Sequence, residues 1–305
     1  MVVAGSTHAV DMIARLHTQP GDIVLVEAPT YADALHIFRD HGVELCGLPM
    51  DEQGVIVAEM EALLQRLNER SRLPKLFYTI PNFHNPTGIT TAEPRRRKII
   101  ELARRYGFMI VEDDVYRYLA FEGAVPPSFL ALAGDVPVMQ VGSFSKTLAP
   151  GLRLGWLVAP SEVIARFVGC GTTQMGGGAS PLSAQIVAEY CRSGAWDRHV
   201  ESLRKRYQMR RDHMLTALAN HMPPGITWTQ PAGGFFVWMS LPRQIQASHV
   251  KREALARGVL VAAGDGYFTN PKDGAHNLRL TYSFAPPEQI EKAVEILAGI
   301  LKDLS

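Results

Sequence analysis

The stretch GSFSKTLAPGLRLGW, residues 142–156, decides how this chain is interpreted. An apolar run directly before it predicts a buried strand, and a serine-rich turn then presents Lys146, with Arg153 seven residues later. Burial at a strand end lowers the pKa of a lysine and turns its amine into a nucleophile. Ser143, Ser145 and Arg153 are donors suited to a phosphate. The stretch indicates a reactive lysine beside an anion site, with an ordinary surface lysine as the alternative.

Outward from this stretch, short apolar runs alternate with segments of helical periodicity. The expected strands are 23–27, 75–80, 108–113 and 136–142, and the expected helices between them are 8–18 and 91–106. The second helix opens with a capping-box pattern, Thr90 to Glu93. Strand–helix alternation predicts an α/β fold with a mostly parallel sheet covered by helices on both faces.

The pattern changes near residue 195. Two helices, 181–192 and 196–220, precede a turn at 223–225, and the elements expected after it are a strand pair at 226–230 and 233–241, a helix at 247–257, strands at 258–262 and 278–284, and a last helix after Pro287. This order predicts a smaller α+β C-terminal domain. We expect a large domain over 1–198 and a small domain over 199–305, with the ligand at the strand ends between them.

Composition excludes several classes of protein. A net charge of +1 gives no reason to expect nucleic acid or a membrane surface as partner. The three cysteines form no CxxC pair and the ten histidines show no ligand spacing, so neither a disulfide framework nor a metal site is expected. Reduced thiols, the absence of an apolar run of 18 residues and a start without signal-peptide features favour a cytoplasmic protein.

Two further motifs follow expected strands. VEDDVY at 111–116 places Asp113 at a strand's carboxyl end, where it could act in acid–base chemistry or bind a metal ion, unless the acids only cap a helix. IPNFHNPTG at 80–88 is a rigid turn that would hold Asn85 toward the strand ends. Each motif taken alone also fits a purely structural role.

Two helix features complete the set. AGSTHA at 4–9 brings free backbone N–H groups and the hydroxyls of Ser6 and Thr7 to a helix start, which is an anion site or a simple N-cap. The basic run from Arg95 to Lys98 is expected to be the solvated face of a helix.

Together these motifs resemble the class I/II aminotransferases, which are fold-type I enzymes that depend on pyridoxal 5′-phosphate (PLP). Asp113 follows Asn85 of NPTG by 28 residues, Tyr116 comes three later, and the lysine of SFSK is followed by arginine at the seventh position. The C-terminal arginine of the family falls on Arg279. Within the class, the motifs look most like 2-aminoadipate and aromatic aminotransferases, and also like the aminotransferase-like domains of MocR-type regulators.

The resemblance implies a role for each residue. Lys146 would form the internal aldimine and shuttle the substrate proton. Asp113 would pair with the pyridine N–H, Tyr116 and Asn85 would bind the phenolic oxygen, and Arg279, with Asn85, would bind the substrate carboxylate. The other cofactor residues implied are Tyr31 over the ring and, for the phosphate, Ser6, Thr7, Ser143, Ser145 and Arg153.

The function implied is a ping-pong aminotransferase that moves an amino group from an amino acid to a 2-oxo acid, working as a homodimer. Two alternatives share these motifs: the PLP-binding effector domain of a MocR-type regulator, and a PLP-dependent decarboxylase or lyase. Family members carry a segment before the first helix, whereas that helix opens this sequence. We therefore expect a family member without its N-terminal part.

Overall fold

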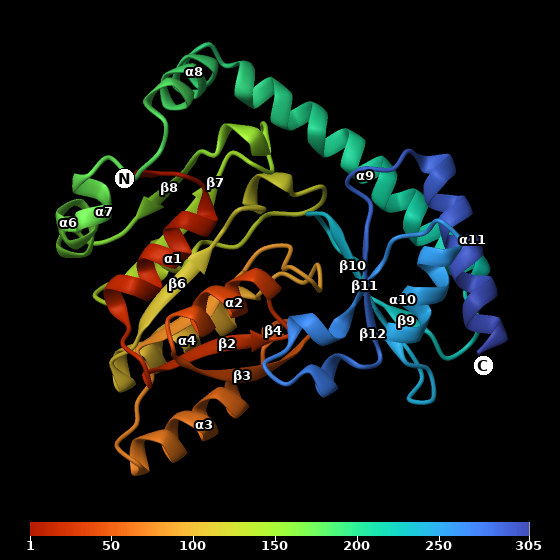
Figure 1. Cartoon of the computed structure of the whole chain (residues 1–305), viewed down its shortest axis with the longest axis horizontal. Helices are drawn as coiled ribbons and strands as arrows, with labels where there is room; N and C mark the ends of the chain where they lie inside the picture. The colour runs from red at the N-terminus through yellow and green to blue at the C-terminus, as the bar shows by residue number, and fades with distance from the viewer. Residues whose placement is uncertain (305) are drawn as a thin grey trace.

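The computed structural model describes residues 1–304, and its largest element is an eight-stranded sheet (Figure 1). In spatial order the strands are β1 (Val2–Val3), β8 (Gly155–Val158), β7 (Val138–Ser143), β6 (Met109–Asp113), β5 (Leu76–Thr79), β2 (Ile23–Ala28), β3 (Glu44–Asp51) and β4 (Gly54–Val55). The pairings from β3 through β2, β5 and β6 to β7 are parallel. Strand β4 pairs antiparallel with β3, and β8 pairs antiparallel with β7. The predicted α/β fold with a mostly parallel sheet is confirmed.

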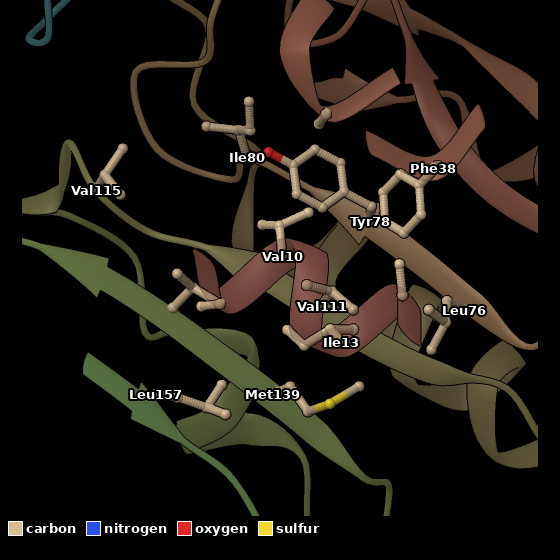
Figure 2. Close-up of a cluster of buried hydrophobic side chains, with 14 of the residues drawn as sticks. Val10, Ile13, Phe38, Leu76, Tyr78, Ile80, Val111, Val115, Met139 and Leu157 are labelled. Atoms are coloured by element: carbon tan, nitrogen blue, oxygen red, sulfur yellow. The ribbon is translucent and has the colours of Figure 1, made fainter. Parts of the chain in front are cut away.

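Helices cover both faces of this sheet. On one face lie α1 (Ser6–His17) and α2 (Ala32–Asp40), and on the other lie α3 (Val57–Glu69), α4 (Glu93–Tyr106) and the short α5 (Phe129–Leu132). Successive strand residues point to opposite faces, so each strand contributes side chains to an apolar core on either side of the sheet. Figure 2 shows the first core, where α1 packs over residues of β5, β6, β7 and β8.

Two local predictions were wrong. Helix α4 begins after Ala92 without a side-chain cap, and Thr90 Oγ instead accepts a hydrogen bond from the Phe83 N–H at 3.2 Å, within the turn that carries Asn85. The strand expected at 258–262 is reduced to β11 (Ala262–Ala263): Val259 and Val261 lie in the core of the small sheet without strand pairing, and Leu260 is exposed.

A second, antiparallel sheet forms the C-terminal part, in the order β11, β12 (Asn277–Thr281), β10 (Phe236–Ser240) and β9 (Thr227–Trp228). Helices α10 (Ala247–Ala256) and α11 (Pro287–Asp303) pack on it. The long helix α9 (Ala195–His221) runs from the body built on the eight-stranded sheet to the body built on the four-stranded sheet (Figure 1). Its Leu203 packs on the large-sheet core and its Leu218 lies in the small-sheet core, so the boundary at 198/199 falls inside a helix and the domain division stays a prediction.

The remaining elements are α6 (Ser161–Gly169), α7 (Gly171–Gln174), α8 (Pro181–Arg192) and 3₁₀ turns at Arg117–Leu119, Pro150–Leu152, Gly264–Tyr267 and Pro271–Gly274. In Figure 1, α8 projects at the top of the molecule, where it leads into α9. Among residues 1–304, no helix combines the length and the apolar character needed to cross a membrane.

Candidate active site

The predicted site residues gather at the carboxyl edge of the parallel strands. Asp113 is the last residue of β6, Ser143 is the last of β7, and Lys146 follows three residues later. Asn85 lies in the turn after β5. Neighbouring parallel strands end at one edge of a sheet, which is where α/β folds bind their ligands.

Lys146 is half-buried, and its Nζ lies 6.0 Å from the centroid of the Tyr116 ring. Burial lowers the pKa of this lysine from its ordinary value; the Asp113 carboxylate opposes the shift, and the positive charge of Arg279 adds to it. Because the lowered pKa enlarges the neutral fraction of the amine, Lys146 is suited to nucleophilic attack.

Asp113 is buried, and its two carboxylate oxygens differ in their surroundings. Oδ2 accepts a hydrogen bond from the Tyr78 hydroxyl at 2.7 Å, while Oδ1 has no hydrogen-bond partner within residues 1–304. Burial raises the pKa of Asp113 to about 6, and the Tyr78 hydrogen bond and Lys146 act against this rise. The side chain is therefore mostly ionised at neutral pH and leaves one buried acceptor for a cationic N–H donor.

Arg279, on β12, meets Asn85 across the two bodies of the molecule. Its Nη1 donates to Asn85 Oδ1 at 3.0 Å, and its guanidinium carbon lies 4.4 Å from the Phe236 ring centroid and 5.2 Å from that of Tyr267. In the part of the chain described, Arg279 Nε has no partner. The guanidinium is thus held between aromatic faces with donors left for a carboxylate.

The start of α1 meets Arg153. Gly5 is the N-cap, and its φ of 86° lies in the left-handed region that favours glycine; a β-carbon there would also lie only 2.8 Å from Arg153 Nη2. Arg153 Nη2 also donates to the Ala4 carbonyl at 3.4 Å. Ser143 pairs with Gly155 in the register of β7 and β8, and Gly155 packs against Gly5. The helix N-terminus, the arginine and one predicted serine therefore form one cradle for an anion.

The other predicted residues lie around this centre. Ser6 and Thr7 form the first turn of α1, with Thr7 exposed. The Ser145 N–H donates to Ser143 Oγ at 3.1 Å. The half-buried Tyr31 donates its hydroxyl to Asp33 at 2.6 Å, and burial raises the pKa of both Tyr31 and the buried Tyr116. Both phenols therefore stay protonated at neutral pH.

Comparison with known proteins decides the family. The model of the family "Aminotransferase class I and II" matches residues 1–297. The chain belongs to this family. It is 37% identical to aromatic-amino-acid aminotransferase 1 of Thermococcus litoralis, with 99% of this chain and 72% of that protein covered. It superimposes with a TM-score of 0.91 and 34% identity on an α-aminoadipate aminotransferase of Thermus thermophilus, solved with N-(5′-phosphopyridoxyl)-L-leucine, over 99% of this chain and 77% of that one.

Membership confirms an aminotransferase that uses PLP and has the fold-type I architecture. The chain is also 35% identical, over its full length, to an uncharacterized HTH-type transcriptional regulator of Bacillus subtilis, of which it spans 61%. Aromatic, 2-aminoadipate and kynurenine aminotransferases stand among its close relatives, and they favour an enzyme over the regulator domain.

The residues of the aminotransferase fit PLP. The partnerless oxygen of Asp113 matches a protonated ring nitrogen, and the cradle of Gly5 and Arg153 matches a phosphate. Lys146 has the lowered pKa that attack on an aldehyde requires. A buried acceptor, an anion cradle and a nucleophilic amine at one sheet edge are the three groups that this cofactor needs.

Sequence reasoning missed three residues of this site. Tyr78 binds Asp113, and Phe236 and Tyr267 hold the Arg279 guanidinium. The signal for Tyr78 lay in its position: a tyrosine within a fully buried strand needs a partner for its hydroxyl. Nothing in the sequence pattern pairs Arg279 with aromatic residues from two other segments.

The basic run on α4 is only partly solvated, so its prediction was wrong for Arg96. This side chain is fully buried under the turn that carries Asn85. It donates to the carbonyls of Thr91 and Pro81 at 2.9 and 3.0 Å and to Asn82 Oδ1 at 2.7 Å. Arg96 therefore ties the turn to the helix, a role that a run of four basic residues does not reveal.

We expect Arg96→Ala to lower the free energy of unfolding by about 3–5 kcal/mol, because it leaves buried acceptors without a donor. Urea denaturation followed by circular dichroism measures this. The matched control is Arg97→Ala on the same helix, where the exposed pair with Glu93 should cost less than about 1 kcal/mol. Equal losses for the two variants would contradict the anchoring role of Arg96.

Proposed function

We propose the following roles for the site residues of this aminotransferase. Lys146 binds the cofactor covalently, Asp113 pairs with its ring N–H, and Asn85 and Tyr116 bind the phenolic oxygen. Arg279, with Asn85, binds the substrate carboxylate. Tyr31 covers the ring, and the phosphate residues are Ser6, Thr7, Ser143, Ser145 and Arg153. The carboxyl edge of the large sheet holds Lys146 and Asp113, and Arg279 of the small sheet lies near enough to act on the lysine; this convergence carries the assignment.

The reaction divides between cofactor and protein. PLP, when bound, supplies an electron-withdrawing ring that stabilises negative charge at the substrate Cα. Asp113 holds the ring nitrogen in its protonated form through Oδ1. Lys146 Nζ would accept the proton from the substrate Cα and would donate it to the cofactor carbon bonded on the other side of the amino nitrogen. Arg279 fixes the carboxylate, so that the proton to be moved stays within reach of Nζ.

The substrates we propose are amino acids with an aromatic or long side chain, and the matching 2-oxo acids. Aromatic side chains surround the carboxylate site: Phe236 and Tyr267 contact Arg279, and Trp238 packs against Tyr267 at 5.7 Å between ring centroids. The names of the aromatic and α-aminoadipate aminotransferases in the comparison point to the same class.

An absorbance titration tests this function. Purified protein with PLP should show a near-visible band that one class of amino acid shifts and its 2-oxo acid partner restores. A band that no amino acid moves would favour the effector domain of a regulator. A shift that releases carbon dioxide or ammonia without restoration would favour a decarboxylase or lyase.

We further propose that two copies associate through α8 and its surroundings. Leu182 and Ile186 lie one turn apart on α8 and are 71% and 52% exposed, and Met175 before the helix is 88% exposed. A hollow beside α8 is lined by Ile186 and by Leu148, which follows Lys146 by two residues in the chain. Clustered exposed apolar residues mark a protein interface. Because this cluster adjoins the segment that follows Lys146, a second copy bound there would lie next to the site.

Sedimentation velocity should therefore give about twice the chain mass of 33.6 kDa. Ile186→Arg places a charge in the proposed interface and should weaken self-association at least tenfold. Leu255→Arg is the matched control, because Leu255 on α10 is similarly exposed at 59% but lies far from α8 in the chain. Equal behaviour of the two variants would contradict the proposed surface.

We place the chain in the cytoplasm and propose the division into a large and a small domain. The cysteines support the first proposal, since Cys46, Cys170 and Cys191 are all free thiols in the part of the chain described. The two separate apolar cores support the second, with the division inside α9.

A further inference from the structure

Tyr78 stands directly behind the carboxylate of Asp113. The register of β5 and β6 places Tyr78 opposite Val111, two residues before Asp113 and on the same face of the sheet. The side chain is fully buried, and its ring meets Phe38 edge to face with 5.7 Å between centroids. Figure 2 shows this pair within the core, with the Tyr78 hydroxyl pointing away from Phe38. The ring is therefore held in one orientation.

Within residues 1–304, the Tyr78 hydroxyl donates to Asp113 and to no other residue. It donates to Oδ2 at 2.7 Å, and burial together with the Asp113 charge raises the pKa of Tyr78 well above its ordinary value. The phenol thus keeps its proton over the working pH range and always acts as the donor. Since Oδ2 is engaged in this way, Oδ1 is the oxygen left without a partner in residues 1–304.

We propose that Tyr78 is a positioning residue of the aminotransferase, whose hydroxyl orients the Asp113 carboxylate so that Oδ1 receives the cofactor ring N–H. This rests on the proposed role of Asp113. A carboxylate with one oxygen fixed cannot rotate its acceptor away from the ring, and the donated hydrogen bond stabilises its ionised form.

The surroundings of Asp113 give the proposal a pH signature. The charged and titratable groups that act on it from the packed elements are Glu27, Tyr31, Tyr78, Asp114, Tyr116 and Lys146. Burial raises the pKa of Asp113 to about 6 despite the Tyr78 hydrogen bond. As the pH falls through about 6, the carboxyl takes up a proton and no longer pairs as an anion with the ring N–H. Cofactor affinity should decline there, and without the hydroxyl this decline should begin at higher pH.

The test measures PLP dissociation constants of the full chain by fluorescence titration between pH 5 and 8.5. In Tyr78→Phe the acid-side midpoint should rise by about one pH unit, since a hydrogen bond to a charged group is lost. Affinity should be about tenfold lower below pH 6 and within about threefold of the parent at pH 8. Protonation of the free cofactor also affects the pH profile, but it contributes equally for all variants and cancels in the comparison. A parallel loss of affinity at every pH, or no change, would overturn the proposal.

Two further variants separate this inference from the assignment it rests on. Asp113→Asn should abolish the midpoint and weaken PLP binding at pH 8 at least tenfold; parent-like affinity would refute the role of Asp113 itself. Tyr78→Phe added to Asp113→Asn should change affinity less than twofold, and a fully additive loss would show that Tyr78 does not act through Asp113. The matched control Tyr282→Phe removes another buried hydroxyl, which donates to the Gly233 carbonyl at 2.9 Å, and should leave the midpoint unmoved.

Discussion

Replacing Lys146 with alanine should abolish covalent attachment of PLP and lower the rate of amino transfer by roughly 10⁴-fold. In the proposed function the lysine supplies the amine that binds the cofactor and the base that moves the Cα proton, so one substitution removes two functions. Its half-buried position and lowered pKa equip it for both.

Borohydride reduction followed by intact-mass spectrometry checks the attachment, and single-turnover kinetics check the rate. The control is Lys205→Ala, which removes an exposed lysine paired with Glu201 at 2.8 Å and should leave both readouts unchanged. A reduced cofactor adduct that persists in Lys146→Ala would assign the covalent role to a different residue.

Replacing Arg279 with lysine should raise KM for the amino acid about a hundredfold and change PLP affinity by less than about threefold. Lysine keeps the charge but loses the planar fork. In the parent chain one arm of that fork donates to Asn85 at 3.0 Å while the guanidinium lies against Phe236 and Tyr267. An ammonium can neither stack on those rings nor bind a carboxylate with two parallel hydrogen bonds.

Steady-state kinetics for the amino acid, beside a PLP titration, distinguish this role from a structural one. Arg257→Lys is the matched control in the same part of the chain, where a half-exposed arginine lies 3.9 Å from Glu253; neither parameter should change. Equal loss of amino-acid and cofactor binding in Arg279→Lys would indicate that Arg279 supports the fold instead.

The order of elements and the edge of the sheet that bears the site were predictable from local pattern. Apolar runs mark the buried strands, and polar residues such as Asp113 and Lys146 follow the points where they end. Parallel strands finish at one edge, so residues that follow different strands are expected at that edge even when far apart in sequence. This is why the motifs around Asn85, Asp113 and Lys146 could be assigned to one site before the strand order was known.

Contacts between distant segments were decided by the tertiary structure alone. Arg279 and Asn85 are 194 residues apart and meet only because the small sheet packs over the turn after β5. Tyr78 reaches Asp113 because β5 and β6 are neighbours in that register, and Arg96 is buried because the same turn folds over α4. Hydrophobic periodicity tells which face of an element is buried, but not which side chain lies opposite it. The amino-acid sequence by itself therefore determined most of the elements and pointed to the proposed reactive residues, while the packing between segments decided which neighbours orient them.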